Sequence, residues 1–144
     1  MKPLATIGYE HATQPDVIAR LKTAKVEVVV DVRAVAASRR AGFSKTVLAA
    51  SLAEAGIDYV HLRELGTPKP GRDAVRHGRI GEMEQIYAAH LKEPAAQLQL
   101  AQAVDIAKDR KAALLCYEAD PAHCHRTIVA HEIRSATGCR IENL

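Results

Sequence analysis

A short, nearly unbroken apolar segment, residues 26–30, constrains the fold of this chain more than any other feature. Its valines favour a parallel strand that is buried on both faces of a sheet. Similar short runs lie at residues 4–7, 57–62 and 112–116, and residues 140–141 are expected to add a last short strand. Amphipathic segments alternate with these runs. The alternation predicts an α/β fold of three layers, αβα, in which a mostly parallel sheet of about four to five strands is flanked by helices.

The segments between the strands carry helical signals. We expect helices at residues 14–24, 45–55, 82–91, 95–108 and 124–137. Thr13 and Ser44 are suitable capping residues for the first two, and Gly56 and Gly138 can end two helices in a left-handed turn. Residues 63–81 are rich in glycine and proline and are predicted to form a long loop. Loops of this length within one domain are usually functional or mobile.

Length and composition narrow the class of protein. A chain of 144 residues suits a single domain, residues 1–144, with an aliphatic core, because aromatic residues make up only 3%. So few aromatic residues also disfavour a base-stacking surface for single-stranded nucleic acid. The chain has no apolar run long enough to span a membrane and no signal-peptide pattern, so we expect a cytoplasmic protein with no membrane partner. The net charge of +3 is weak evidence for an anionic partner.

The cysteines are three in number and lie late in the chain, at Cys116, Cys124 and Cys139. An odd number without a disulfide framework predicts free thiols in a reducing compartment. Cys116 ends a predicted strand and Cys124 begins a predicted helix, where the helix dipole favours a thiolate. With His125 for proton transfer, these residues are the candidate catalytic groups. The alternative is that both cysteines are structural, Cys116 in the core and Cys124 at the start of a helix.

Polar residues gather where the predicted strands end. In open parallel sheets, ligands bind at the carboxyl ends of the strands, so these residues are expected to share one site. The candidate substrate-binding residues are Asp31, Arg33, Ser38, Arg39, His61 and Arg126. Arginine side chains and free N–H groups at a helix start would hold a phosphate-like or other small anion. The alternative for Asp31 and Arg33 is a structural ion pair.

A metal site and a cofactor are not predicted. The segment 116–125 contains competent metal ligands, but its C-x7-C-H spacing matches no common structural zinc pattern. The sequence also lacks the P-loop, the dinucleotide-binding fingerprint, the zincin motif and the serine-hydrolase elbow. Common nucleotide, zincin and serine-hydrolase functions therefore lose their main support.

Four segments, spread over nearly the whole chain, form a specific combination. They are Thr6-Ile7-Gly8-Tyr9; Val29-Val30-Asp31-Val32-Arg33 with Ser38-Arg39; Phe43-Ser44 with Tyr59-Val60-His61-Leu62 and Leu65-Gly66; and Leu115-Cys116 with Cys124-His125-Arg126. In this combination the chain resembles the family known as domain of unknown function 488. Many members have His and Ser after the first glycine, where this chain has Tyr9 and Glu10, so a role for that pair is not carried over. The resemblance implies an α/β fold and no established activity.

A weaker likeness, of architecture only, is to rhodanese and dual-specificity phosphatase domains. They share a strand ending in Asp-x-Arg and a later strand ending at a cysteine before a loop and a helix. Their short loop wraps around an anion and often ends in arginine. Here Ala122 occupies the position of that arginine in a phosphatase loop, and Arg126 lies ten residues after Cys116.

Three functions remain in competition. The leading one is a thiol-dependent enzyme with a phosphate-like anion and a reactive cysteine at the carboxyl edge of the sheet. The second is a nucleic-acid-associated protein or nuclease-like enzyme, in which basic loops contact phosphates and Asp31 and Glu118 bind Mg²⁺. The third is a non-catalytic binding module, in which the same polar residues only hold the loops.

Overall fold

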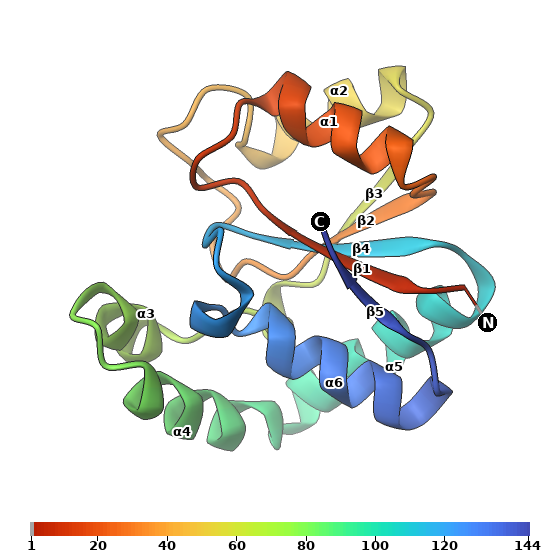
Figure 1. Ribbon diagram of the computed structural model, residues 1–144. Helices are drawn as coiled ribbons and strands as arrows, with labels where there is room; N and C mark the ends of the chain where they lie inside the picture. The colour runs from red at the N-terminus through yellow and green to blue at the C-terminus, as the bar shows by residue number, and fades with distance from the viewer. Residues whose placement is uncertain (1) are drawn as a thin grey trace.

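The computed structural model describes residues 2–144 and contains one five-stranded sheet between two layers of helices (Figure 1). The strands are β1 (Leu4–Gly8), β2 (Val28–Asp31), β3 (Asp58–His61), β4 (Ala112–Cys116) and β5 (Ile141–Asn143). They lie in the order β3-β2-β4-β1-β5, and every neighbouring pair is parallel. The predicted three-layer α/β fold is confirmed.

Two helical layers cover the sheet. The helices are α1 (Gln14–Thr23), α2 (Lys45–Glu54), α3 (Lys69–Arg76), α4 (Ile80–Leu91), α5 (Pro94–Asp109) and α6 (Arg126–Thr137), with short 3-10 turns η1 (Arg63–Leu65) and η2 (Pro121–His123). Helices α1 and α2 pack on one face, and α3 to α6 lie on the other (Figure 1). None of the helices among the described residues is long and apolar enough to cross a membrane.

The valines of β2 explain why its sequence is so uniformly apolar. Val28 and Val30 belong to the core under α4, α5 and α6, whereas Val29 belongs to the core under α1 and α2. Successive side chains of a strand point to opposite faces, and here helices cover both faces. All three valines are therefore buried, and no position on β2 between them is left for a polar residue.

The capping predictions are confirmed in part. The Thr13 hydroxyl accepts the N–H of Asp16 at 3.3 Å at the start of α1. Gly56 and Gly138 have φ of 77°, in the left-handed region that ends a helix most easily in glycine. Ser44 does precede α2, but its hydroxyl makes no capping bond and instead accepts the N–H of Ser38 at 3.0 Å.

The prediction of one long loop over residues 63–81 is wrong. This segment contains η1 and α3, and α4 already begins at Ile80. Pro70 lies in the first turn of α3, where a missing N–H costs no helical hydrogen bond. Gly71 is buried, and a Cβ there would overlap the methyl group of Thr67. The proline and glycine that favoured a loop are thus compatible with a short helix packed against α4.

The strand order opens a crevice at the carboxyl edge of the sheet. β1 and β4 are neighbours, but the chain leaves β1 toward α1 on one face and β4 toward α6 on the other (Figure 1). Connections that diverge in this way leave room for a ligand. Gly8 ends β1 at this point, and a Cβ there would overlap the carbonyl oxygen of Glu118. Glycine therefore permits the loop after β4 to approach β1 closely.

Candidate functional site

A cleft of about 680 Å³ lies at this edge of the sheet. Its walls come from the segments that follow β1, β2 and β4 and from α3. Its polar lining is Tyr9, Glu10, Arg33, Ser38, Arg39, Thr67, Arg72, Arg76, Cys116, Tyr117, Glu118, His123 and His125. The cleft therefore combines one cysteine with several guanidinium groups.

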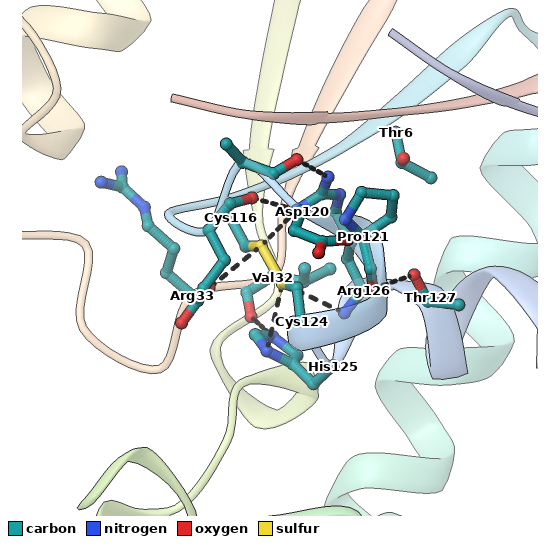
Figure 2. The surroundings of a disulfide bond; sticks show 12 residues. Thr6, Val32, Arg33, Cys116, Asp120, Pro121, Cys124, His125, Arg126 and Thr127 are labelled. Atoms are coloured by element: carbon teal, nitrogen blue, oxygen red, sulfur yellow. Dashed lines mark hydrogen bonds between the residues drawn. A yellow bond between two sulfur atoms is a disulfide. The ribbon is translucent and has the colours of Figure 1, made fainter. Parts of the chain in front are cut away.

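Cys116 and Cys124 form a disulfide in this structure (Figure 2). The prediction that both are free thiols is wrong for this state of the protein. The turn η2 folds the connection between the two cysteines back and brings Cys124 beside the end of β4. Cys139 is free and buried, as expected for an unpaired core cysteine.

Arg126 is the largest fully buried side chain, and no carboxylate of the described residues forms an ion pair with it, although the charges of Glu118 and Asp120 act on it from farther away. One terminal nitrogen, Nη1, donates to the sulfur of Cys116 at 3.1 Å and to the carbonyl oxygen of Glu118, and Nη2 donates to that of Ala119 at 3.3 Å. Nε has no hydrogen-bond partner and the group forms no ion pair within residues 2–144. Burial lowers the pKa of Arg126, because a charged group loses its hydration there. A buried charge without a counter-charge favours an anion beside it.

Cys124 and His125 lie directly before α6, not within it. The helix begins at Arg126, so the predicted start at residue 124 is two residues early, and Cys124 is extended. The N–H of Arg126 donates to the sulfur of Cys124 at 3.5 Å. The Nε2 atom of His125 lies 2.7 Å from the carbonyl oxygen of Val32, and its Nδ1 lies 3.8 Å from the Cys124 sulfur. Because a carbonyl only accepts, Nε2 carries the proton and Nδ1 is an acceptor.

The titration of two side chains is shifted by burial. Burial lowers the pKa of His125 to about 4, opposed by the hydrogen bond to Val32 and assisted by the charge of Arg126. Burial also raises the pKa of Glu118, whose Oε2 lies 3.5 Å from the sulfur of Cys116. His125 is thus neutral near pH 7, and Glu118 holds a proton more readily than an ordinary glutamate.

Asp31 and Arg33 form a buried ion pair that belongs to the framework of the site. Arg33 Nη2 donates to Asp31 at 2.7 Å, Nε donates to the same carboxylate, and Nη1 donates to the hydroxyl of Tyr9 and the carbonyl of Phe43. Burial alone would lower the pKa of Arg33, but the hydrogen bonds and charge of Asp31 outweigh it and raise that pKa. The hydroxyl of Tyr59 also donates to Asp31. Most donors of Arg33 are therefore used within the fold.

Of the other candidate binding residues, two line the cleft and one lies outside it, against the backbone of a lining residue. Ser38 and Arg39 line the cleft. The Ser38 hydroxyl accepts the N–H of Arg40 at 3.1 Å, whereas exposed Arg39 makes no hydrogen bond or ion pair with the part of the chain described. His61 does not line the cleft, and its Nε2 lies 2.7 Å from the carbonyl oxygen of Arg33, which it supports.

Two arginines of the cleft, Arg72 and Arg76, were not among the residues predicted from the sequence. They lie on α3, inside the segment predicted to be a loop. Residues four apart on a helix share a face, and this spacing would have found them if the helix had been recognised. The Arg72 side chain donates to the carbonyl oxygen of Thr67 at 2.9 Å, and Arg76 pairs with exposed Asp73 at 3.4 Å.

Three potential metal ligands also meet here. Single ligand atoms of Cys116, Glu118 and Cys124 lie within 4.8 Å of one another. A metal binds thiolates, and the two sulfurs are bonded to each other in this structure. These residues can therefore offer sulfur ligands only after reduction.

Comparison with known proteins places the chain in a family. The model of the family described as "Domain of unknown function DUF488" matches residues 13–133, which is most of the chain. The chain belongs to this family, as its sequence motifs indicated. No curated protein and no solved structure matches it. The family description states no activity.

Proposed function

We propose that this member of the DUF488 family is a thiol-dependent enzyme that binds a small phosphate-like anion in the cleft and uses Cys116 as its nucleophile. One observation carries the proposal. The buried Arg126 guanidinium has no carboxylate partner and donates to the sulfur of Cys116, which lines the cleft. In the dithiol state, a Cys116 thiolate would give this arginine an anion in direct contact. A reducing compartment, such as the cytoplasm, would maintain that state.

Three arginines support the binding of an anion. Arg39, Arg72 and Arg76 line the cleft, against the two carboxylates of Glu10 and Glu118. Burial raises the pKa of Glu118, which reduces its share of negative charge. Arg76 also pairs with Asp73, so the charges of Arg39 and Arg72, which form no ion pair within the described residues, attract anionic substrates, and arginine binds phosphate-like groups through parallel hydrogen bonds.

Glu118 is placed to move the proton that the reaction needs. The Cys116 thiolate attacks an electrophilic centre beside the anionic group, forming a bond to sulfur as the bond to the leaving group breaks. The Glu118 carboxyl lies 3.5 Å from that sulfur, and burial raises its pKa, so its protonated form is the one that would give a proton to the leaving group. Its carboxylate then accepts a proton from the second nucleophile, such as water, which releases the Cys116 thiolate and restores the site.

The proposal is tested by site-resolved alkylation of the reduced protein. A neutral reagent, iodoacetamide, is used across pH, and each cysteine is followed by peptide mass spectrometry with increasing inorganic phosphate. We expect Cys116 in the folded protein to react roughly tenfold faster near pH 6 than in the urea-unfolded chain, because it is a thiolate there. Phosphate should slow Cys116 in the folded protein only.

Variants locate the anion. Arg72→Gln with Arg76→Gln should abolish protection by phosphate, whereas Arg63→Gln, an exposed arginine outside the cleft, should leave protection unchanged. The proposal is overturned if folded Cys116 reacts more slowly than the unfolded chain at every pH, or if phosphate gives no protection.

A non-catalytic binding module is the second candidate, and the Asp31–Arg33 pair favours it. The donors of Arg33 go to Asp31, Tyr9 and Phe43, as in a framework that holds loops in place. A module of this kind would still bind phosphate in the cleft. It would differ in the alkylation profile of Cys116, which would follow that of an ordinary buried thiol.

A further inference from the structure

We infer that the Cys116–Cys124 disulfide is a second functional state of the site, and that small anionic thiols entering the cleft reduce it by attacking Cys116. The inference rests on the proposed function, since it needs a cleft that attracts anions. It adds a thiol–disulfide exchange activity, with a class of co-substrate, and it gives Cys124 and His125 roles that differ from that of Cys116.

The two cysteines differ in their relation to the cleft. Cys116 is among the residues that line it, whereas Cys124 is not and lies just before the start of α6. Both residues are otherwise buried, with exposed fractions of 1% and 3%. In thiol–disulfide exchange the rate depends on which sulfur an attacking thiolate can reach. A thiol that enters the cleft therefore approaches Cys116 rather than Cys124, and a small local opening is needed before it reaches the buried sulfur.

Cys124 has the surroundings of a good leaving group. Its sulfur accepts the backbone N–H of Arg126 at 3.5 Å. This N–H lies at the N-terminus of α6, where the helix dipole favours negative charge. His125 Nδ1, the unprotonated ring nitrogen, lies 3.8 Å from the same sulfur and can accept an S–H hydrogen bond. The thiolate and the thiol of Cys124 each have a partner, so cleavage of its bond to Cys116 leaves no unpaired group.

The exchange balances with two equivalents of thiol. The first thiolate attacks the Cys116 sulfur and forms a mixed disulfide, while Cys124 leaves as a thiolate and takes up the proton that the attacking thiol released. The second thiolate attacks the outer sulfur of the mixed disulfide. Cys116 then leaves as a thiolate beside Arg126, the proton of the second thiol passes to solvent, and the two small thiols are oxidised to their disulfide. The protein gains two electrons and becomes the dithiol that the proposed function requires.

The charge of the cleft selects among thiols. Arg39, Arg72 and Arg76 outnumber Glu10 and Glu118, and the guanidinium of Arg39 has no partner in the described structure. An anionic thiol is therefore concentrated near Cys116, and a cationic one is repelled. Electrostatic attraction of this kind commonly changes association rates by about tenfold or more at low salt.

The experiment compares three small thiols with the oxidised full-length chain. The probes are 3-mercaptopropionate, 2-mercaptoethanol and cysteamine, which carry a negative, a zero and a positive charge. Samples are quenched with N-ethylmaleimide, and reduction is followed by mass. Each rate is divided by the thiolate concentration and by the rate of the same thiol with hydroxyethyl disulfide, an uncharged reference.

We expect the normalised rates to fall in the order anionic, neutral, cationic, with roughly tenfold between the extremes at low salt. High salt, and Arg72→Gln with Arg76→Gln, should remove the order. Arg63→Gln is the control and should keep it. The first mixed disulfide, located by fragmentation, should lie on Cys116.

Three results would overturn the inference: equal normalised rates, a mixed disulfide on Cys124, or reduction only after the chain is unfolded in urea. None of these results affects phosphate protection of the reduced protein, because the protein has no Cys116–Cys124 disulfide in that measurement. Failure of the exchange and failure of the proposed function are therefore separate outcomes.

Discussion

Replacement of His125 by glutamine is expected to remove an acid sensitivity from the stability of the fold. The pKa of His125 is about 4, lowered from 6.5 by burial. At about 1.4 kcal/mol for each pH unit, this difference corresponds to about 3 kcal/mol. The unfolded chain binds a proton at this histidine below pH 6.5, whereas the folded chain remains neutral until about pH 4. The contribution of His125 to stability is therefore constant above pH 6.5 and falls by about 3 kcal/mol between pH 6.5 and 4.

The assay is urea unfolding at a series of pH values with the disulfide intact. Glutamine keeps an N–H donor for the carbonyl of Val32 and does not titrate. The charged and titratable groups that act on His125 are Arg126, Asp31 and His90, and all are common to both proteins. The difference in unfolding free energy between wild type and His125→Gln thus isolates the histidine.

We expect the wild type to lose about 3 kcal/mol more than His125→Gln between pH 6.5 and 4. Any constant cost of the substitution, such as imperfect packing, shifts both ends of the range equally. Parallel curves for the two proteins would refute the reasoning, since His125 would then titrate alike in the folded and unfolded chains.

Three further substitutions test other parts of the structure. Gly8→Ala forces a methyl group against the carbonyl of Glu118 and should cost roughly 2 kcal/mol or more in urea unfolding, so an unchanged midpoint would contradict the close approach. Asp31→Asn leaves the buried charge of Arg33 without its partner and should lower stability by about 3–5 kcal/mol, seen as a large fall in Tm. Arg39→Gln should weaken phosphate protection of Cys116 while changing the unfolding free energy by less than about 0.5 kcal/mol, and a large loss of stability would show that Arg39 is structural.

The fold was predictable because a strand that is buried on both faces of a parallel sheet has an almost uniformly apolar sequence. The valines of β2 show this apolar pattern, and the capping residue Thr13 indicates the start of α1. The prediction from sequence was wrong over residues 63–81, where proline and glycine indicated a loop. Packing against the following helix α4 stabilises the eight-residue helix α3 there, and packing between helices is not visible in local propensity.

Many residues of the candidate site could be predicted from the sequence, but the disulfide between Cys116 and Cys124 could not. Because ligands bind at the carboxyl ends of parallel strands, the sequence predicted that Asp31, Cys116 and Arg126 lie at one edge of the sheet. The disulfide depends on how the connection after β4 folds back, which spacing alone does not determine. The direct contact of the unpaired Arg126 guanidinium with the Cys116 sulfur, without a carboxylate at ion-pair distance among the described residues, is likewise a property of the folded chain, and the proposed function follows from it.

The most direct test of the central claim is the pH profile of Cys116 alkylation in reduced wild-type protein and in Arg126→Met. The account predicts rapid reaction of the wild type near pH 6, and a profile moved to higher pH in Arg126→Met, with a rate roughly tenfold or more lower near pH 6. Arg126→Lys keeps the charge and should stay close to the wild type, which separates loss of charge from loss of fold. Coincident profiles for wild type and Arg126→Met would contradict the claim that Arg126 stabilises a Cys116 thiolate.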